Sequence, residues 1–263
     1  MKRILVLALA LILLMATCAS AEDFALRGYD KIDGYQYVSL GEFPQDADGT
    51  VRPILWRVLS VEDTYAYLLS EYILFNNRVH PDDQEYIAFS AAFNQTEMFH
   101  LLNGPFEGNP ISIEEQEKLK GRERLGRVHI AEICFKDQAF TQAEQSMLLV
   151  DEQLGMVFLA SADDLKNSAF GFSGAKDRQA RGTQYALANG LFRYQNGTSP
   201  YWTRSQSSSY AYATRCTKVD GNLGYIRCVV MNEGCRPAIR LSLDGLEVTG
   251  GSGTMEDPYT FVR

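Results

Sequence analysis

Residues 35–70 read YQYVSLGEFPQDADGTVRPILWRVLSVEDTYAYLLS, and polar and apolar side chains alternate at the start of this stretch. Such alternation is typical of a β-strand, because successive side chains point to opposite faces of a sheet. The GEFPQ segment at residues 41–45 ends this strand, and Asp and Gly at residues 46–49 favour a tight turn. The stretch therefore predicts a meander of strands at residues 35–40, 54–61 and 65–70.

Helical signals follow in the middle of the chain. Apolar residues recur at helical spacing over residues 89–102, before an Asn-Gly-Pro stop. Ser112 opens a second helix with Glu115 as its capping partner, and residues 143–150 predict a short third helix. Further along, residues 156–160 predict a short strand, and residues 161–164 predict the cap of a brief helix.

The last third of the chain is rich in strands. Asp-Gly-Asn at residues 220–222 separates two alternating runs and predicts a hairpin. The expected strands are residues 210–219, 223–231 and 237–243. Strands, then helices, then strands again indicate an α+β fold, since a parallel sheet would alternate strands and helices.

The first 21 residues have the three parts of a secretory signal peptide. A basic MKR start is followed by an unbroken apolar run and by Ala-Ser-Ala at residues 19–21. The run is shorter than the roughly twenty residues of a membrane-spanning helix. We therefore expect cleavage after Ala21 and a mature domain of residues 22–263. Lipoprotein processing at Cys18 is less favoured, because Thr precedes it where that pathway prefers Gly, Ala or Ser.

Cleavage would change the net charge from −8 to −10, because the signal holds two basic residues and no acidic one. An acidic chain is repelled by phosphate backbones and by anionic lipid, which argues against nucleic acid as a partner and against electrostatic docking on an anionic membrane surface. No later segment is long and apolar enough to span a membrane. The mature chain is expected to be secreted or associated with the cell envelope.

Cleavage would also leave four cysteines, Cys134, Cys216, Cys228 and Cys235. An even number in an exported chain permits disulfides, and the spacing does not resemble a zinc site. We expect one bridge within the group Cys216, Cys228 and Cys235, with free buried thiols as the alternative. A two-residue hairpin turn would place Cys216 and Cys228 on opposite faces, whereas a three-residue turn would place both on one face.

Several motifs run in the order found in a bacterial family known as domain of unknown function 6273. They are YVSLGEFPQ (37–45), PILWRVL (53–59), LLSEYIL (68–74), LLN (101–103), VFLAS (157–161), YWTRS (201–205), GCRPAI (234–239), GT (253–254) and DPY (257–259). The chain resembles this family over most of its mature length. Members are mostly exported or surface-attached proteins of Gram-positive bacteria, and the family has no established activity.

The YWTRS and GCRPAI motifs are also similar to the closing pattern of formylglycine-generating enzymes and C-type-lectin-like domains. This resemblance implies one compact α+β domain with antiparallel sheets, a few short helices, and termini brought together on a sheet. Two departures concern the helical segment, where Phe89 or Phe93 replaces the usual Trp, and residues 127–155, which form a longer stretch than is typical.

Motifs of known catalysts are missing. A formylglycine-type oxidase would need a reactive cysteine pair, for which Cys228 and Cys235 are the candidates. A reactive thiol needs exposure and a lowered pKa, whereas Cys228 lies in an apolar strand. Gly-Phe-Ser-Gly at residues 171–174 falls one position short of the hydrolase elbow. The three histidines, His80, His100 and His129, carry no catalytic motif.

Oxygen donors at Asp46 and Asp48 match only the start of a calcium loop, and those at residues 82–85 form no recognised pattern. We therefore predict no catalytic residue, no metal and no cofactor.

The candidate binding residues are Tyr201, Trp202, Arg204 and Arg236. Aromatic faces stack on sugar rings, and arginine offers a planar fork of donors. The main hypothesis is a non-catalytic domain that binds a glycan or a protein of the cell envelope. The alternative function is an enzyme with an unrecognised cleft near Arg204 and Arg236. For the residues themselves, the alternative is a structural role, with Trp202 in the core and Arg204 in a buried ion pair.

Overall fold

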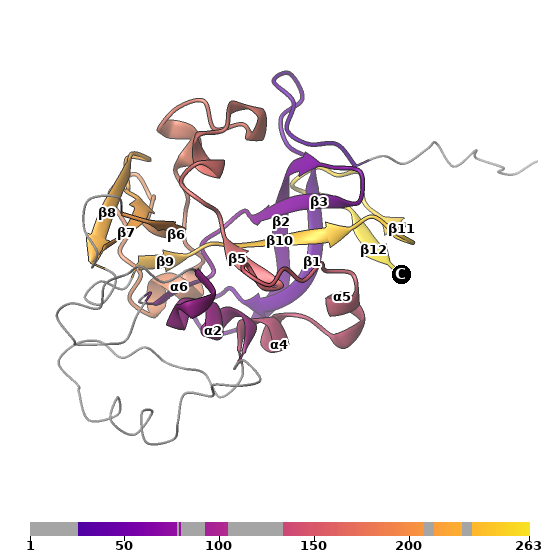
Figure 1. Ribbon diagram of the computed structural model, residues 1–263, viewed down its shortest axis with the longest axis horizontal. Coiled ribbons are helices and arrows are strands. Elements are labelled where there is room, and N and C mark those ends of the chain that lie inside the picture. Colours follow the sequence, from indigo (N-terminus) through magenta and orange to yellow (C-terminus); the bar gives the residue numbers. More distant parts are fainter. Residues whose placement is uncertain (1–25, 78, 80–92, 105–133, 208–212, 228–232) are drawn as a thin grey trace, which may run out of the picture.

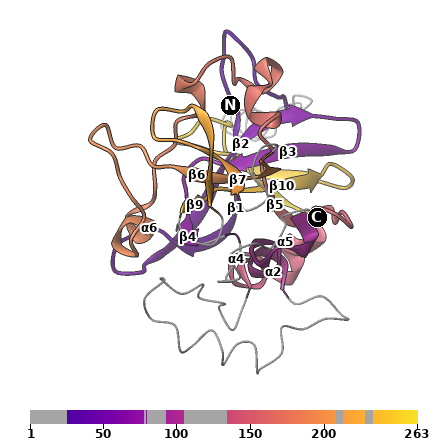
Figure 2. The ribbon, with the colours of Figure 1, turned by 60° about the vertical axis from the view of Figure 1, so that its left-hand side comes forward.

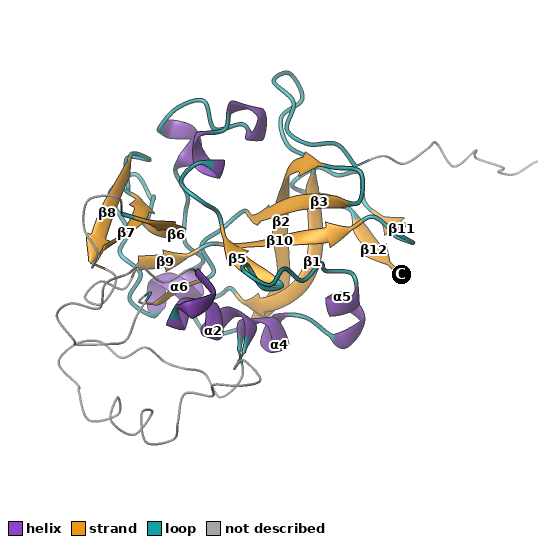
Figure 3. Ribbon diagram, in the orientation of Figure 1, coloured by secondary structure: helices purple, strands orange, loops and turns teal. Residues whose placement is uncertain are grey.

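A computed structural model of the chain describes residues 26–77, 79, 93–104, 134–207, 213–227 and 233–263 (Figure 1). These residues form two five-stranded sheets and a two-stranded ribbon, with a few short helices around them (Figure 3). The mixture is mostly β-sheet and is compatible with the expected α+β class. The predicted helix at Ser112, His80, His129 and the donors at residues 82–85 lie outside the described residues.

The first sheet contains the predicted meander. Its strands, in order across the sheet, are β1 (Tyr37–Pro44), β2 (Val51–Val61), β3 (Tyr65–Ser70), β10 (Pro237–Ser242) and β5 (Val157–Leu159), with antiparallel neighbours throughout. The prediction that the first strand ends at Leu40 is wrong. A bulge between Ser39 and Glu42 lets β1 continue to Pro44, and Gly41 adopts a φ of 70° there.

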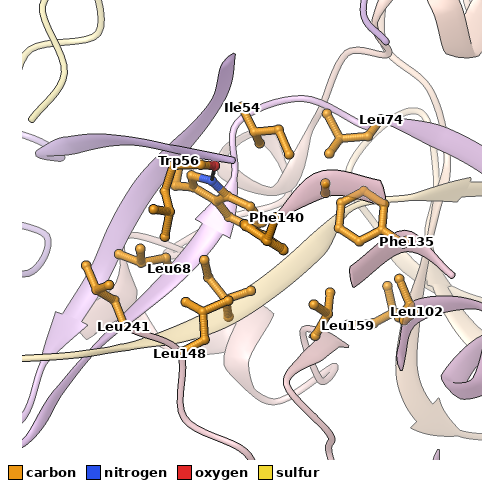
Figure 4. Packing of buried hydrophobic residues seen from close by; sticks show 14 of the residues in the cluster. Ile54, Trp56, Leu68, Leu74, Leu102, Phe135, Phe140, Leu148, Leu159 and Leu241 are labelled. Atoms are coloured by element: carbon orange, nitrogen blue, oxygen red, sulfur yellow. Dashed lines mark hydrogen bonds between the residues drawn. The ribbon is translucent and has the colours of Figure 1, made fainter. Parts of the chain in front are cut away.

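Side chains of the first sheet alternate between two buried clusters. The first face of the sheet carries Trp56, Leu68 and Ile239, which belong to the larger cluster drawn in Figure 4. The second face carries Leu69 and Ala238, which belong to a separate cluster. Because both faces are covered, neighbouring residues such as Leu68 and Leu69 are both buried.

Three short helices cover the first face, below the sheet in Figures 1 and 2. They are α2 (Glu97–Asn103), α4 (Phe135–Ala139) and α5 (Gln142–Ser146). Thr141 and Glu144 form a capping box at the start of α5, and Glu144 also accepts a hydrogen bond of 3.0 Å from the Gly41 N–H at the bulge. No helix in the described part of the chain is long and apolar enough to cross a membrane.

The second face is covered by four short elements that follow β5. They are η3 (Asp164–Lys166), η4 (Ser168–Phe170), η5 (Lys176–Arg178) and α6 (Gln184–Ala188). The three 3₁₀ turns lie above the first sheet in Figures 1 and 2. Leu165, Phe172 and Ala186 from this segment pack in the second cluster.

The second sheet contains β4 (Phe75–Asn77), β9 (Glu233–Cys235), β6 (Tyr201–Gln206), β7 (Ala213–Thr217) and β8 (Leu223–Arg227), in that order. The hairpin of β7 and β8 pairs Cys216 with Gly224. Lys218 donates its backbone N–H to Asn222, so three residues form the turn. The longer of the two turns considered from the sequence is therefore the one observed.

The expected disulfide is not seen. Cys216 and Cys235 are both free and buried, as is Cys134, and Cys228 lies outside the described residues. Cys235 instead packs against Met98, with 3.5 Å between the sulfur atoms. Burial raises the pKa of Cys216 to about 12 and raises the pKa of Cys235 as well. These three cysteines are therefore free buried thiols, which was the alternative to a disulfide.

The C-terminal segment returns to the first strand. After the ribbon strand β11 (Glu247–Gly250), Tyr259 forms a parallel bridge with Val38 and the chain ends in β12 (Thr260–Val262). The Tyr259 N–H donates to Tyr37, and the Ser39 N–H donates to Tyr259. The C-terminal segment therefore lies beside β1, the first strand of the described chain.

Candidate ligand-binding site

Two arginines lie over one buried aromatic ring on the second face of the first sheet. The guanidinium carbons of Arg204 on β6 and Arg240 on β10 each lie 5.6 Å from the ring centre of Phe158 on β5. They are therefore separated by at most twice 5.6 Å, about 11 Å. Ala238 pairs with Phe158, so residue 240 projects from the same face. We call Arg204 and Arg240 the arginine pair.

Arg204 is fixed by three hydrogen bonds. Its Nη1 donates to the carbonyl of Leu159 at 2.7 Å and to Oδ2 of Asp164 at 2.8 Å. Its backbone N–H donates to Ala160 at 3.1 Å, which ties β6 to the end of β5. Arg204 is therefore held in place both by its backbone N–H and by its guanidinium.

Asp164 is itself held by its neighbours. Its Oδ2 accepts the Ser161 N–H at 2.7 Å and the Tyr67 hydroxyl at 2.9 Å, and its own N–H donates to the Ser161 hydroxyl at 2.9 Å. This reciprocal pairing confirms the cap predicted at residues 161–164. It places a rigid carboxylate against Arg204.

Arg240 has a similar anchor. Its Nη1 lies 3.2 Å from Oδ2 of Asp151, and its guanidinium carbon lies 5.3 Å from the ring centre of Tyr65. Asp151 also accepts the N–H groups of Gln153 at 2.8 Å and Leu154 at 3.0 Å. The Gln153 N–H is the main reason that the pKa of Asp151 lies below its usual value.

One edge of each guanidinium in the arginine pair is left open. Within the described part of the chain, the Nε and Nη2 atoms of Arg204 and Arg240 have no hydrogen-bond partner. They are not among the buried polar atoms, and the two side chains are 20% and 29% exposed. In Arg57 the same two nitrogens both contact Oε2 of Glu71. In Arg204 and Arg240 the Nε and Nη2 donors therefore face solvent, whereas in Arg57 the same donors bind a carboxylate.

Aromatic rings surround the arginine pair. The Tyr67 ring lies 5.7 Å from Phe158 and 5.7 Å, edge to face, from Phe170. Burial and the nearby Asp164 carboxylate raise the pKa of Tyr67 well above its usual value. The Tyr67 hydroxyl therefore remains protonated and is the donor in its hydrogen bond to Asp164.

The chain matches the family described as Domain of unknown function (DUF6273) over residues 65–243, which is more than half of its length. The chain belongs to the DUF6273 family. No curated protein and no solved structure matches it. The matched region contains the whole arginine pair with Phe158, Asp151 and Asp164, whereas β1, β2 and the C-terminal ribbon lie outside it.

The DUF6273 structure buries three of the four binding residues expected from the sequence. Tyr201, Trp202 and Arg236 are each 1% exposed, and Arg204 is the one with a solvent-accessible side chain. Strand alternation sends Tyr201 into the second cluster and Trp202 into the first, where its indole N–H donates to the Asn77 carbonyl at 2.7 Å. The core role considered for Trp202 therefore fits its position better than a stacking surface.

Arg236 lies inside the DUF6273 domain beside Tyr201. Its Nε donates to Ser70 at 2.8 Å, its Nη1 lies 3.4 Å from the Tyr201 hydroxyl, and its Nη2 has no partner among the described residues. Burial, and then the nearby Arg57, lower the pKa of Arg236. An enclosed donor of this kind cannot reach a ligand without movement of its neighbours, so Arg236 is not part of the candidate site.

Other predicted donors have local partners. Asp48 accepts the Thr50 N–H and hydroxyl, and Asp46 pairs with Arg52, so both carboxylates stabilise the predicted turn at residues 46–49. His100 lies on α2, within the described chain. In that part of the chain no group of His, Cys, Asp and Glu side chains could hold a metal ion.

Sequence reasoning missed Arg240 and Phe158 as site residues. Both were placed in predicted strands, at residues 237–243 and 156–160. The alternation of side chains along a strand places Arg240 and Phe158 each on one of the two faces of a sheet. It does not say which face, or which strands are neighbours. The capping pattern at residues 161–164 was the available signal for Asp164, although not for its ion pair with Arg204.

Proposed function

We propose that this DUF6273 chain is an exported, non-catalytic domain that binds a glycan or a protein of the cell envelope at the arginine pair. The observation that carries the proposal is the pair of anchored guanidiniums with unpartnered donor edges above one ring. Binding sites gain affinity when their groups are held in place beforehand, because less conformational freedom is lost on association.

Export is proposed from the sequence, with cleavage after Ala21. A C-type-lectin-like fold is proposed from the YWTRS and GCRPAI motifs. Its support in the structure is the bridge between Val38 and Tyr259, which brings the C-terminal segment to the first strand of the first sheet. The short strands and helices agree with such a domain.

A non-catalytic role is favoured by the way the site uses its acidic groups. Asp164 and Asp151 each accept backbone N–H bonds and an arginine, so both carboxylates are already engaged in holding the site together and neither is free to act as a general base. The described thiols have raised pKa values, which disfavours nucleophilic thiolates.

One observation favours the enzyme alternative. Burial raises the pKa of Glu233 on β9 to about 7, a value suited to general acid–base chemistry. However, in the described chain no hydrogen bond or ion pair joins Glu233 to Arg204 or Arg236. A cleft enzyme built on these residues therefore has weaker support than a binding domain.

The test uses the full chain, expressed with its signal and purified from the exported fraction. Intact mass should show cleavage after Ala21. The processed protein is then screened against a glycan array and against isolated cell envelopes. We expect binding that falls in the Arg204→Gln and Arg240→Gln variants.

Arg52→Gln is the matched control, because Arg52 pairs with an aspartate on the surface but lies at the start of β2 and is not part of the arginine pair. Retention of the chain in the cytoplasm would contradict export. Equal binding by all three variants would contradict the site, and no binding to either preparation would contradict the binding function.

A further inference from the structure

We propose that the arginine pair recognises an acidic glycan, with one oxyanion group seated on the Nε/Nη2 edge of each guanidinium. This inference rests on the proposed binding function and names the chemistry of its ligand. Nε–H and Nη2–H point the same way from a guanidinium, and this fork matches the two oxygens of a carboxylate or phosphate.

The chain contains its own example of a filled edge. Arg57 directs Nε and Nη2 at the carboxylate of Glu71, and its side chain is 11% exposed. Arg204 and Arg240 use only Nη1 for their aspartates, so the corresponding edge remains open in both. An oxyanion on that edge would complete the same arrangement without displacing either aspartate.

The negative charges of Asp164 and Asp151 do not completely neutralise the positive charges of the arginine pair. The charge of Asp164 is shared with the Ser161 N–H and the Tyr67 hydroxyl, and that of Asp151 with two backbone N–H groups. These dipoles stabilise each carboxylate by themselves. Each guanidinium therefore keeps part of its attraction for a second anion.

The geometry favours a ligand that carries more than one oxyanion. The two guanidiniums share the Phe158 ring and are fixed by separate anchors, so the distance between them is set before binding. A second group on the same ligand then binds at a high effective concentration. The half-buried Tyr65 beside Arg240 offers an aromatic face for a sugar ring.

A glycan is favoured over an acidic protein because the charged side chains of the site are only partly exposed. The four charged side chains of the site are between 18% and 35% exposed. A stable protein interface would need about 800 Å² on each partner. A short acidic saccharide instead needs only two oxyanion groups that span the distance of at most about 11 Å between the guanidiniums.

The experiment measures binding of defined probes to the processed chain by calorimetry at low salt. The probes are a galacturonate oligosaccharide, the matching neutral galactose oligosaccharide, a glycerol-phosphate oligomer and a glutamate peptide. We expect the galacturonate or glycerol-phosphate probe to bind, and the neutral sugar to bind at least about tenfold more weakly. Comparison of the first and third probes distinguishes carboxylate from phosphate.

Arg204→Lys and Arg240→Lys keep the charge and an ion pair with the aspartate but remove the fork. Each substitution should weaken the binding of the acidic probe about tenfold, whereas Arg52→Lys should leave the binding of this probe unchanged. Circular dichroism confirms that the variants are folded.

Equal binding of the acidic and neutral sugars, or full binding by both lysine variants, would overturn the inference. Tighter binding of the glutamate peptide would overturn the choice of a glycan. If the chain still binds cell envelopes when either of these results is obtained, the proposed binding function stands, but its ligand is not an acidic glycan. If the acidic probe binds but no envelope preparation does, the inference survives and the proposed function fails.

Discussion

The Tyr67 hydroxyl donates a hydrogen bond of 2.9 Å to Oδ2 of Asp164, across 97 residues of sequence. This bond joins β3 in the middle of the first sheet to the start of η3. Since the same Asp164 oxygen accepts Nη1 of Arg204, Tyr67 acts on the arginine pair by holding the carboxylate that anchors Arg204. Tyr67 is therefore a positioning residue.

Tyr67→Phe should lower the free energy of unfolding by about 1.5–3 kcal/mol, because it removes a partly buried hydrogen bond to a charged acceptor. Chemical denaturation measures the loss. Tyr65→Phe is the control on the same strand, because the Tyr65 hydroxyl has no partner within the described chain. Equal stabilities of the two variants would show that the bond to Asp164 contributes nothing.

Local patterns in the sequence predicted much of the first sheet. Residues 65–70 were expected as a strand with the bounds that β3 has, and the cap at residues 161–164 depends only on neighbouring residues. The position of the arginine pair depends on contacts between distant strands. Arg240 faces Phe158 because β10 pairs with β5 in one register, and no short-range pattern encodes that register.

The same limit explains the expectation for Trp202. An aromatic next to an arginine suits a ligand surface, and alternation alone would expose one side of β6. In the structure Tyr201, Trp202 and Thr203 are all buried, because β6 is covered on both faces. Only the packing of the second sheet against the first removes these side chains from solvent.

The bulge in β1 allows a second test. Gly41 has a φ of 70°, and an added Cβ would lie 2.6 Å from the Ala139 carbonyl oxygen and 2.6 Å from the Phe140 ring. Gly49 also has a positive φ, of 83°, but nothing lies within 4 Å of its added Cβ. The two positions separate backbone strain from steric clash.

Gly49→Ala should cost about 1–2 kcal/mol of unfolding free energy from backbone strain alone. Gly41→Ala should cost at least about 1 kcal/mol more, because the carbonyl of α4 cannot move as a flexible side chain would. Thermal and chemical denaturation of both variants checks this order. The reverse order would mean that α4 does not pack against the bulge as described.

Glu233 gives the stability of the second sheet a dependence on pH. Glu233 is 4% exposed, its charge adds to the raised pKa of Cys216 on β7, and burial raises its own pKa from 4.5 to about 7. Between these two values the folded chain keeps a proton that the unfolded chain has released. Stability should therefore fall as the pH rises through this window, by at most about 3 kcal/mol, and stay low above it.

Glu233→Gln removes the charge and should flatten this part of the pH profile. The variant should match the parent chain near pH 4 and exceed it in stability at pH 8, because the parent must then bury a carboxylate. Glu247→Gln, on the exposed strand β11, is the control and should follow the parent at every pH. Denaturation curves at several pH values measure the difference, and parallel profiles for parent and Glu233→Gln would contradict a raised pKa at this position.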